Sequence, residues 1–573
     1  MQVPAKKALV IVGLLSAGAC TEDAALTVLP PGEPFCARVL PAVDAFLEAG
    51  RSRDPVQGDA PYGGSVVIGG LGEIPNGMMS TATSDYVAGQ HQQFVNLMTL
   101  IDYDEDFQPR PYLAESWEVA PDGTALTFHL RDDVFWHDGE RTDAHDVAFT
   151  YRRVTDPAAG FPNAAFWDHY LPGDEGVEVL DERTVRFRLA PHGDFLDPWR
   201  SVAILPEHLL GDVPPGELRG HPYATRCPVG NGPFVFLEHR EQEVWRFAAN
   251  PSFPEALGGR PYLDGYVYRV IPDENTLLLE LLSGGVDVFI SPQPDQADAI
   301  LADPDLELLR YPFRNVTFVA WNARRPQLAD ARVRRAITLA TGREEIVQVL
   351  LQGYGSVADG TVPPWHWAFD PEVGAMPHDP EAARRLLDGA GWRDRDGDGV
   401  REDASGRPLS LSLKTNQGNR RLQRLGTIMQ AHLREVGVEL RLELMEWSAL
   451  VAQLTDTEGR DYDGVVLSWV TEFKLDDTDL FHSQRVDRPY AFSGTRDARL
   501  DAFLDSLPLV TDRARAREMW RAYQARLAEV HPFTFFYFPD RLDGVNRRVQ
   551  GVEMDARGEW VNLKEWRVTA PAR

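Results

Sequence analysis

Cysteine and positive charge are both scarce in this chain. It has 3 cysteines among 573 residues, enough for a single disulfide. Lys and Arg number 58 against 87 Asp and Glu, which gives a formal net charge of −29. Nucleic acid and anionic lipid attract proteins through clustered Lys and Arg, so this balance argues against both as partners.

Recognisable catalytic motifs are also missing. The sequence has no GxSxG and no GxxxxGK[ST], and the GGLGE segment at 69–73 does not fit GxGxxG. Its histidines show neither HExxH nor another spacing that would build a zinc site. With 87 acidic residues, a pair of carboxylates near any cleft is expected by chance and indicates nothing. We therefore predict neither an enzyme nor a bound cofactor.

No apolar run in the sequence is long enough to span a bilayer, and the one near the N-terminus, at 8–15, is too short to do so. Lys6 and Lys7 precede it, and small residues lead from it to Cys20. This pattern resembles a bacterial lipoprotein signal over 1–20, although Ala17 stands where Leu is usual. We expect lipidation of Cys20 and a periplasmic or cell-surface protein that meets the membrane through this lipid anchor alone. Plain secretion with cleavage nearby is the alternative.

Residues 21–61 are rich in Pro, Gly and Ala, with one helical stretch around 37–49. We expect this N-terminal extension to be a tether between the anchor and the folded body. In an oxidising compartment, Cys36 and Cys227 either form a disulfide or remain idle thiols. We expect the disulfide, which would pin the extension to the body.

Residues 112–154 have the pattern of a β-meander that turns into a helix. The two Asp-Gly turns use Gly for its positive φ. Between the turns, apolar and polar residues alternate as in a half-buried strand, the apolar ones being Leu126, Phe128 and Leu130. Thr142 is the predicted cap of the helix that follows, because carboxylates fill the first turn after it.

The order of elements in this block, LAESW, DG, TFHLR, HDG and DVAF, resembles the family-5 solute-binding proteins, the extracytoplasmic receptors of peptide-type ABC importers. Further blocks match in the same order: the strand entry at 228–236, a strand–helix–strand unit at 262–290 and a helix from 330. The resemblance covers roughly 65–568. It implies an α/β protein with the two-lobed periplasmic-binding-protein fold (type II, cluster C) and a small subdomain on the first lobe.

The resemblance also implies how the domains follow one another. The expected segments are 62–101, 227–312 and 531–573 for the first lobe, 102–226 for the small subdomain and 313–530 for the second large lobe. Two crossing segments, near 310–315 and 528–535, would join the lobes, which would close around a solute by hinge motion.

The segment DRDGDGVRE at 394–402 begins like a calcium loop. Asp394, Asp396 and Asp398 occupy positions 1, 3 and 5, but position 12 is Ser405 instead of a bidentate Glu. Because only the first half of the motif is present, we expect a tight turn that leads into a strand. A cation bound by the three Asp carboxylates is the alternative.

The best candidate for contact with a solute is SWVTEF at 468–473. In peptide-binding members of the family, a Trp is followed three residues later by an Asp that pairs with the ligand's α-ammonium group. Here the Trp is Trp469 and the matching carboxylate is Glu472. Such a charge-assisted hydrogen bond contributes about 1.5–3 kcal/mol. Glu is longer than Asp by one methylene, and the following D-P of the family is absent, so a surface Glu without a ligand is the alternative.

Four further residues complete the predicted ligand site. Trp365 and Trp367 either stack on a peptide or a sugar ring in the cleft or pack locally. Asn416 and Asn419 either point their amides into the cleft or cap the helix that follows them.

These predictions describe a monomeric receptor that captures di- or oligopeptides between its lobes and delivers them to the permease subunits of an ABC importer. A peptide suits such a cleft because backbone hydrogen bonds give affinity without regard to side chains. Two alternatives stay open. One is a receptor for another small solute, such as an oligosaccharide or a metal chelate, and the other is a sensory lipoprotein that does not transport.

Overall fold

The structure, a computed structural model, describes residues 34–51, 62–83, 85–162, 164–167, 170–171, 176–190, 196–456, 459–471, 473, 475–510 and 512–569. The predicted signal at 1–20 with Cys20, and the predicted ligand carboxylate of Glu472, lie outside these residues. In the described part of the chain, no helix combines the length and the apolar character needed to cross a membrane.

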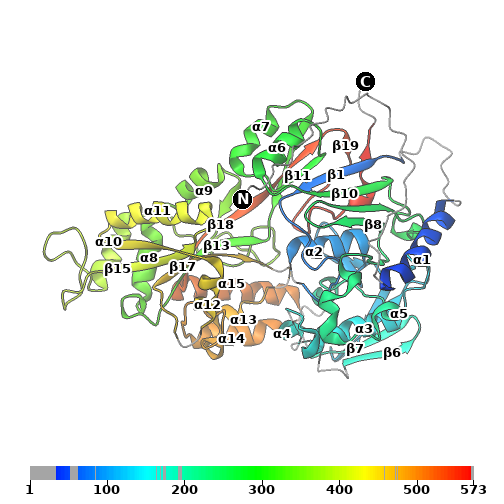
Figure 1. Ribbon diagram of the computed structural model, residues 1–573. Helices are drawn as coiled ribbons and strands as arrows, with labels where there is room; N and C mark the ends of the chain where they lie inside the picture. Colours follow the sequence, from blue (N-terminus) through cyan, green and yellow to red (C-terminus); the bar gives the residue numbers. More distant parts are fainter. Residues whose placement is uncertain are drawn as a thin grey trace, which may run out of the picture.

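A sheet of 12 strands runs through both lobes and is held together by the long strand β18 (Figure 1). In spatial order the strands are β16 (Glu439–Met445), β15 (Ser410–Asn416), β17 (Gly464–Val470), β13 (Asn315–Trp321), β18 (Phe533–Asn546), β11 (Val288–Ile290), β1 (Ser65–Gly70), β10 (Gly265–Val270), β9 (Val244–Ala249) and β8 (Phe234–Arg240). β12 (Leu306–Pro312) and β14 (Gly355–Val357) also pair with β18.

The first lobe contains the part of this sheet from β11 to β8. Because side chains alternate across a strand, β1 contributes Val66 and Ile68 to one core and Val67 to another. The core beside Val67 contains Leu277 of α6 (Glu274–Leu282) and Ile300 of α7 (Ala297–Leu301). On the other face lie α2 (Tyr86–His91) and the π-helical turn Gln92–Asn96.

The small subdomain is built on a four-stranded antiparallel sheet of β4 (Ala114–Val119), β5 (Ala125–Leu130), β7 (Thr184–Arg188) and β6 (Val177–Asp181). Leu126, Phe128 and Leu130 are fully buried, so the predicted strand alternation is confirmed. The predicted cap of α3 (Ala144–Thr155) is wrong by one residue. Asp143, not Thr142, accepts the backbone N–H groups of the first turn in a capping box. The neighbouring elements are β2 (Ile101–Tyr103), β3 (Pro109–Pro111), α4 (Ala164–Trp167) and α5 (Glu207–Leu210).

The N-terminal extension is a packed helix over part of its length. α1 (Pro34–Arg51) buries Val39, Val43 and Leu47 in the large core shared by the first lobe and the subdomain. Cys36 and Cys227 are joined in a disulfide with 5.6 Å between their Cα atoms. Residues 34–51 therefore belong to the folded body and are not a tether, because their apolar side is covered and covalently fixed.

The second lobe carries cores on both faces of strands β13, β17 and β15. Its helices are α8 (Ala331–Ala340), α9 (Arg343–Leu351), α10 (Pro380–Gly389), α11 (Arg420–Glu435), α12 (Trp447–Thr455), α13 (Thr478–Phe481), α14 (Ala498–Ser506) and α15 (Arg513–Val530). Helices α8 to α11 contribute to the core beside Val319, and α12 to α15 to the core beside Phe318.

Two chain segments cross between the lobes. The first is the step from β12 to β13, at the predicted place. The second was predicted at 528–535 but lies further along, inside β18. Phe533 to Tyr537 pair with β13 of the second lobe, whereas Asp540 to Asn546 pair with β12. The second lobe thus extends beyond the predicted boundary at 530, because β18 is one continuous strand that serves both lobes. A short ribbon of β19 (Val549–Gln550) and β20 (Arg567–Val568) follows it.

Candidate functional site

A cleft of about 1320 Å³ lies between the lobes. The first lobe contributes the start of α6 and the loop after β11, and the second lobe contributes α9, the start of α11 and Ser468 of β17. Residues of β18 on both sides of the crossing also line it. Its walls therefore belong to two bodies joined only by strand crossings, which is the arrangement that hinge motion opens and closes.

A hydrogen bond between α11 and the first lobe spans this cleft. Arg421, in the first turn of α11, donates from Nη2 to Oε1 of Gln293 in the first lobe at 2.8 Å. Gln293 in turn donates to Glu274 of α6 at 3.3 Å. The contact links the helix start of one lobe to the helix start of the other.

The predicted amide residues both line the cleft. Asn416 stands at the end of β15, and its Oδ1 accepts the N–H of Gly418 at 3.0 Å. Asn419 is the N-cap of α11 and accepts the N–H of Leu422 at 3.1 Å. Asn419 thus caps α11, whereas Asn416 closes the turn before the helix. Contact of either amide with a solute stays a prediction.

A second part of the interface between lobes is a cluster of aromatic and arginine side chains around Phe473, which we call the Phe473 cluster. The Phe473 ring comes from the loop after β17 and faces Tyr103 and Phe107, at centroid distances of 5.5 and 5.3 Å. The guanidinium of Arg200 lies 4.9 Å from the Phe473 ring and that of Arg314 lies 4.4 Å from it. These are cation–π distances.

Arg200 is the buried cation of this cluster. It ends the 3-10 turn Asp197–Arg200, and its Nε lies 3.4 Å from Oδ1 of Asp102. Burial lowers the pKa of its guanidinium to about 10, against the attraction of Asp102, so Arg200 is charged at neutral pH.

The cleft and the Phe473 cluster are continuous. Phe313 and Arg541 line the cleft, and both contact Tyr86, with centroid and cation distances of 5.5 and 5.4 Å. The guanidinium of Arg314 lies 5.7 Å from the same Tyr86 ring and also covers Phe473. A row of rings and guanidinium groups therefore leads from the open cleft to the buried cluster.

The predicted tryptophans divide between the interface and the interior of the second lobe. Trp365 reaches the first lobe, with its ring 5.0 Å from that of Phe107 and 5.7 Å from that of Phe473. Trp367 packs on the core that contains Phe318, beneath the guanidinium of Arg513 at 4.9 Å.

Trp469 also faces the interior of the second lobe. Its ring contacts Tyr490 at 5.5 Å and packs on the same core as Trp367. Ser468, its neighbour in β17, lines the cleft, and the alternation along a strand directs Trp469 away from it. A contact between Trp469 and a solute in the cleft stays a prediction.

Two buried groups hold the loop that carries Phe473. His366 contacts the carbonyl oxygen of Phe473 through Nε2 at 3.0 Å, and burial lowers the pKa of His366 to about 4. Asp477 accepts the hydroxyls of Thr361 at 2.6 Å and Tyr523 at 2.8 Å. Burial raises the pKa of Asp477 to about 6, against these two hydrogen bonds.

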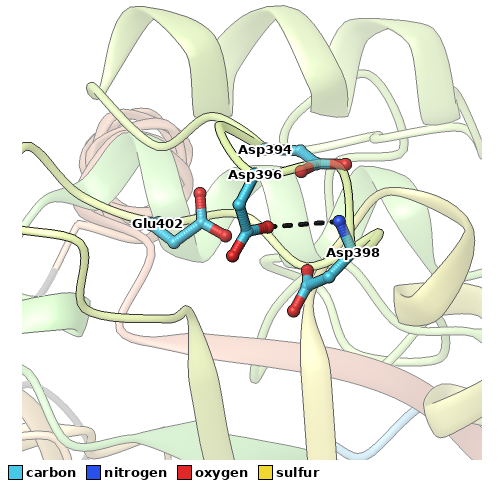
Figure 2. A group of neighbouring side chains, drawn as sticks. All are labelled: Asp394, Asp396, Asp398 and Glu402. Carbon is cyan, nitrogen blue, oxygen red and sulfur yellow. Dashed lines mark hydrogen bonds between the residues drawn. The ribbon is translucent and has the colours of Figure 1, made fainter.

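The predicted tight turn at 394–402 is present, and it gathers one more carboxylate than expected (Figure 2). Asp394, Asp396, Asp398 and Glu402 place carboxylate oxygens within 4.8 Å of one another. Each carboxylate accepts backbone N–H groups of the loop, for example those of Gly397 at 2.7 Å and Arg395 at 2.9 Å. These hydrogen bonds account for the acidic residues as turn formers, and a bound cation stays a prediction.

Apart from Trp365, and from Phe473 at the end of the predicted segment 468–473, the residues of the Phe473 cluster were not predicted. Tyr103, Arg200 and Arg314 sit in segments without a local motif. One feature of the sequence could have indicated Arg200. It stands in the largely apolar stretch WRSVAIL at 199–205, where a charged side chain is buried in the structure.

Comparison with known proteins gives concordant matches over most of the chain. The family model described as bacterial extracellular solute-binding proteins, family 5, matches residues 108–487. The chain is similar to the oligopeptide-binding protein AppA of Bacillus subtilis, with 29% identity over 89% of this chain and 92% of the relative. It is also similar to the probable di/tripeptide-binding protein 5 of Pseudomonas aeruginosa, with 30% identity over 69% of this chain and 74% of the relative.

Solved structures agree in fold. AppA of Bacillus subtilis in complex with a nonapeptide superposes with a TM-score of 0.74 at 27% identity, covering 89% of this chain and 100% of that one. The binding protein CtaP of Listeria monocytogenes gives a TM-score of 0.78 at 22% identity, covering 89% of this chain and 100% of that one. The predicted two-lobed α/β fold of type II is confirmed by these superpositions.

Proposed function

Because this chain belongs to family 5 of the bacterial extracellular solute-binding proteins, we propose that it captures peptides between its lobes outside the cytoplasm and delivers them to the permease of an ABC importer. Members of this family are transport receptors and not enzymes. The proposed role needs no covalent chemistry, because hinge closure around the solute and recognition of the closed form are enough.

The cleft between the lobes is the observation that carries the proposal. Its volume of about 1320 Å³ exceeds the roughly 300–1,000 Å³ of sites for drug-sized molecules. Polar amides and charges from both lobes line it, as suits a chain with many backbone donors and acceptors. AppA, a relative that resembles this chain along most of its length, holds a nonapeptide.

Native mass spectrometry of protein purified without denaturation tests the proposal. We expect a series of bound masses that correspond to peptides. Protein that has been unfolded, washed and refolded is the control, and it should regain the same masses from added peptides. A single mass of a sugar or a metal chelate would contradict the proposal and favour a receptor for another solute.

Glu472 is the proposed partner of the peptide's α-ammonium group, on the strength of the motif that begins at Trp469. Glu472→Gln removes the negative charge and keeps the size of the side chain. We expect it to weaken binding of free-amine peptides about tenfold or more and to leave N-acetylated peptides nearly unaffected. Equal losses for both peptides, measured by calorimetry, would remove Glu472 from the site.

A lipid anchor at Cys20 is proposed for the attachment of the receptor to the membrane. The positive residues, short apolar run and small residues before Cys20 support it. Cys20→Ser should move the protein from the membrane fraction to the soluble fraction of cells, and the wild-type N-terminal peptide should carry the added mass of acyl chains. Wild-type protein found in the soluble fraction would favour plain secretion.

A further inference from the structure

Buried hydrogen-bond donors without acceptors surround the ring of Phe473. They are Nη2 of Arg200, the hydroxyl of Tyr103 and Nε1 of Trp365, and none of them meets a partner among the described residues. Arg200 is 5% exposed and Tyr103 2% exposed. A buried polar group left in this way costs on the order of 1–3 kcal/mol, so their presence calls for an explanation.

The three donors belong to one place. The Arg200 guanidinium lies 4.9 Å from the Phe473 ring, and the rings of Tyr103 and Trp365 lie 5.5 and 5.7 Å from it. Tyr103 and Arg200 come from the segment between 102 and 226, whereas Trp365 comes from the second lobe. A ligand group that met all three donors would therefore lie between the lobes.

The chemistry of the three donors indicates which kind of ligand group they can bind. Arg and Trp side chains have N–H groups and no acceptor, and the Tyr hydroxyl donates as well. A ligand group that meets all three must present several acceptor lone pairs in a small volume. A carboxylate does so, and Arg recognises it with particular strength.

The local charge also favours an anion. Asp102 is shared between two cations, because its Oδ2 lies 2.7 Å from Arg110 and its Oδ1 3.4 Å from Arg200. The guanidinium groups of Arg314 and Arg557 are close enough to lower the pKa of Arg200 further. Arg557 is paired with Asp555 at 2.6 Å, and Asp104 acts on Arg557 from further away.

From this juxtaposition we infer that Tyr103, Arg200 and Trp365 form a subsite for a carboxylate of the solute, either the terminal carboxylate of a peptide or that of an acidic side chain. The inference rests on the proposed function and narrows it to solutes that carry an acidic group. A carboxylate held here bonds to both sides of the interface at once, so it favours the closed arrangement of the lobes over the open one.

The test compares retention of two peptide mixtures by native mass spectrometry. One is a tryptic digest of a single protein, and the other is the same digest with all carboxylates converted to methyl esters. Wild-type protein should retain the esterified digest at least about tenfold less, because a charge-assisted hydrogen bond is lost. The Arg200→Gln variant should retain the untreated digest as poorly as it retains the esterified digest.

Arg110→Gln is the matched control, because it removes a guanidinium from the outer side of the same Asp102. It should keep the wild-type preference for free carboxylates. Tyr103→Phe removes only a hydroxyl that has no partner among the described residues, so its thermal midpoint should not fall while retention of the untreated digest drops several-fold. A preference for free carboxylates that survives unchanged in Arg200→Gln would overturn the inference.

Two further outcomes separate this inference from the proposed function. A retained peptide is resynthesised with a C-terminal amide in place of its terminal carboxylate. If the protein no longer retains it, the subsite binds the terminal carboxylate. If retention is kept, the subsite binds an acidic side chain. If wild-type protein retains neither digest, the peptide proposal fails. The solute that co-purifies with the protein then decides the subsite: an acidic solute absent from Arg200→Gln supports it, and a solute without an acidic group overturns it.

Discussion

At the scale of single residues, Trp365 and Trp367 show how two similar side chains, two positions apart, take different roles. The Trp365 ring crosses to Phe107 of the other side of the interface. The Trp367 ring stays on the core of its own lobe, under Arg513. Mutation should therefore affect binding in one case and stability in the other.

We predict that Trp365→Ala weakens solute binding by about 1–3 kcal/mol, because the ring contacts across the closed interface are lost. Trp367→Ala should leave the affinity within about twofold and lower the free energy of unfolding by about 2–4 kcal/mol, the cost of a large cavity at a partly buried site. Calorimetry with a retained peptide and urea unfolding measure the two quantities. Both variants losing affinity equally would place Trp367 in the site as well.

At the scale of elements, the loop from β17 to α13 depends on a buried carboxylate. Asp477 is held by hydroxyls from Thr361 and from Tyr523 of α15, and burial raises its pKa to about 6 from an ordinary 3.8. A carboxyl whose pKa is higher in the folded state stabilises the fold while it is protonated. That contribution is fully present below pH 3.8 and is lost as the pH rises through 6.

Asp477→Asn should remove this pH dependence, since the amide carries no charge at any pH and keeps an oxygen for the two hydroxyls. Relative to wild type, we predict that the variant gains stability on the order of 3 kcal/mol between pH 4 and pH 7. Urea unfolding at several pH values gives the difference. Asp479→Asn, at an exposed position of α13, is the control and should show no such trend.

Local rules explain which elements could be predicted from the sequence. The alternation of Leu126, Phe128 and Leu130 and the cap at Asn419 depend on residues within one strand or one helical turn. The cap at Asp143 was missed by one position because Thr142 is an equally good capping residue by type. α1 was predicted only in part, because its burial depends on a distant core and on Cys227.

The candidate site was less predictable than the fold. Its cleft amides and Trp365 stand beside motifs, so resemblance could indicate them. The donors at Tyr103 and Arg200 are far from Phe473 in sequence, and only the meeting of the lobes brings them together. Glu402 was overlooked because it stands at the ninth position of the loop, where the calcium motif does not require a bidentate Glu.

The disulfide between Cys36 and Cys227 also acts at the scale of elements. It closes a loop with a sequence separation of 191 and fixes α1 to the folded body. Replacing both Cys36 and Cys227 by Ser should lower the free energy of unfolding by about 2–5 kcal/mol. Solute affinity should not change, since α1 contributes no residue to the cleft walls. Wild-type protein in a reducing agent is the control for urea unfolding and should match the variant.

At the scale of the whole molecule, two crossing segments and the contacts between the lobes govern how the lobes move. The crossings lie at 313–314 and inside β18, side by side in the sheet, and they leave the rest of each lobe free to rotate. Two sets of contacts oppose the opening of the lobes. The Phe473 cluster lies at one end of the interface, and the hydrogen bond from Arg421 to Gln293 lies at the other. The stability of the closed arrangement should thus depend on contacts at both ends of the interface.

Arg421→Ala isolates the second of these contacts. Both side chains are half-buried, so the bond is worth about 0.5–1.5 kcal/mol, and its loss should raise the dissociation rate of a bound peptide about three- to tenfold. The association rate should change less, because an open cleft lacks this bond. Stopped-flow displacement of a labelled peptide measures both rates. Arg424→Ala is the matched control: Arg424 lines the same cleft from the same helix, and among the described residues it makes no hydrogen bond to the first lobe. Equal acceleration in the two variants would assign the effect to the positive charge of α11 and not to the bond across the cleft.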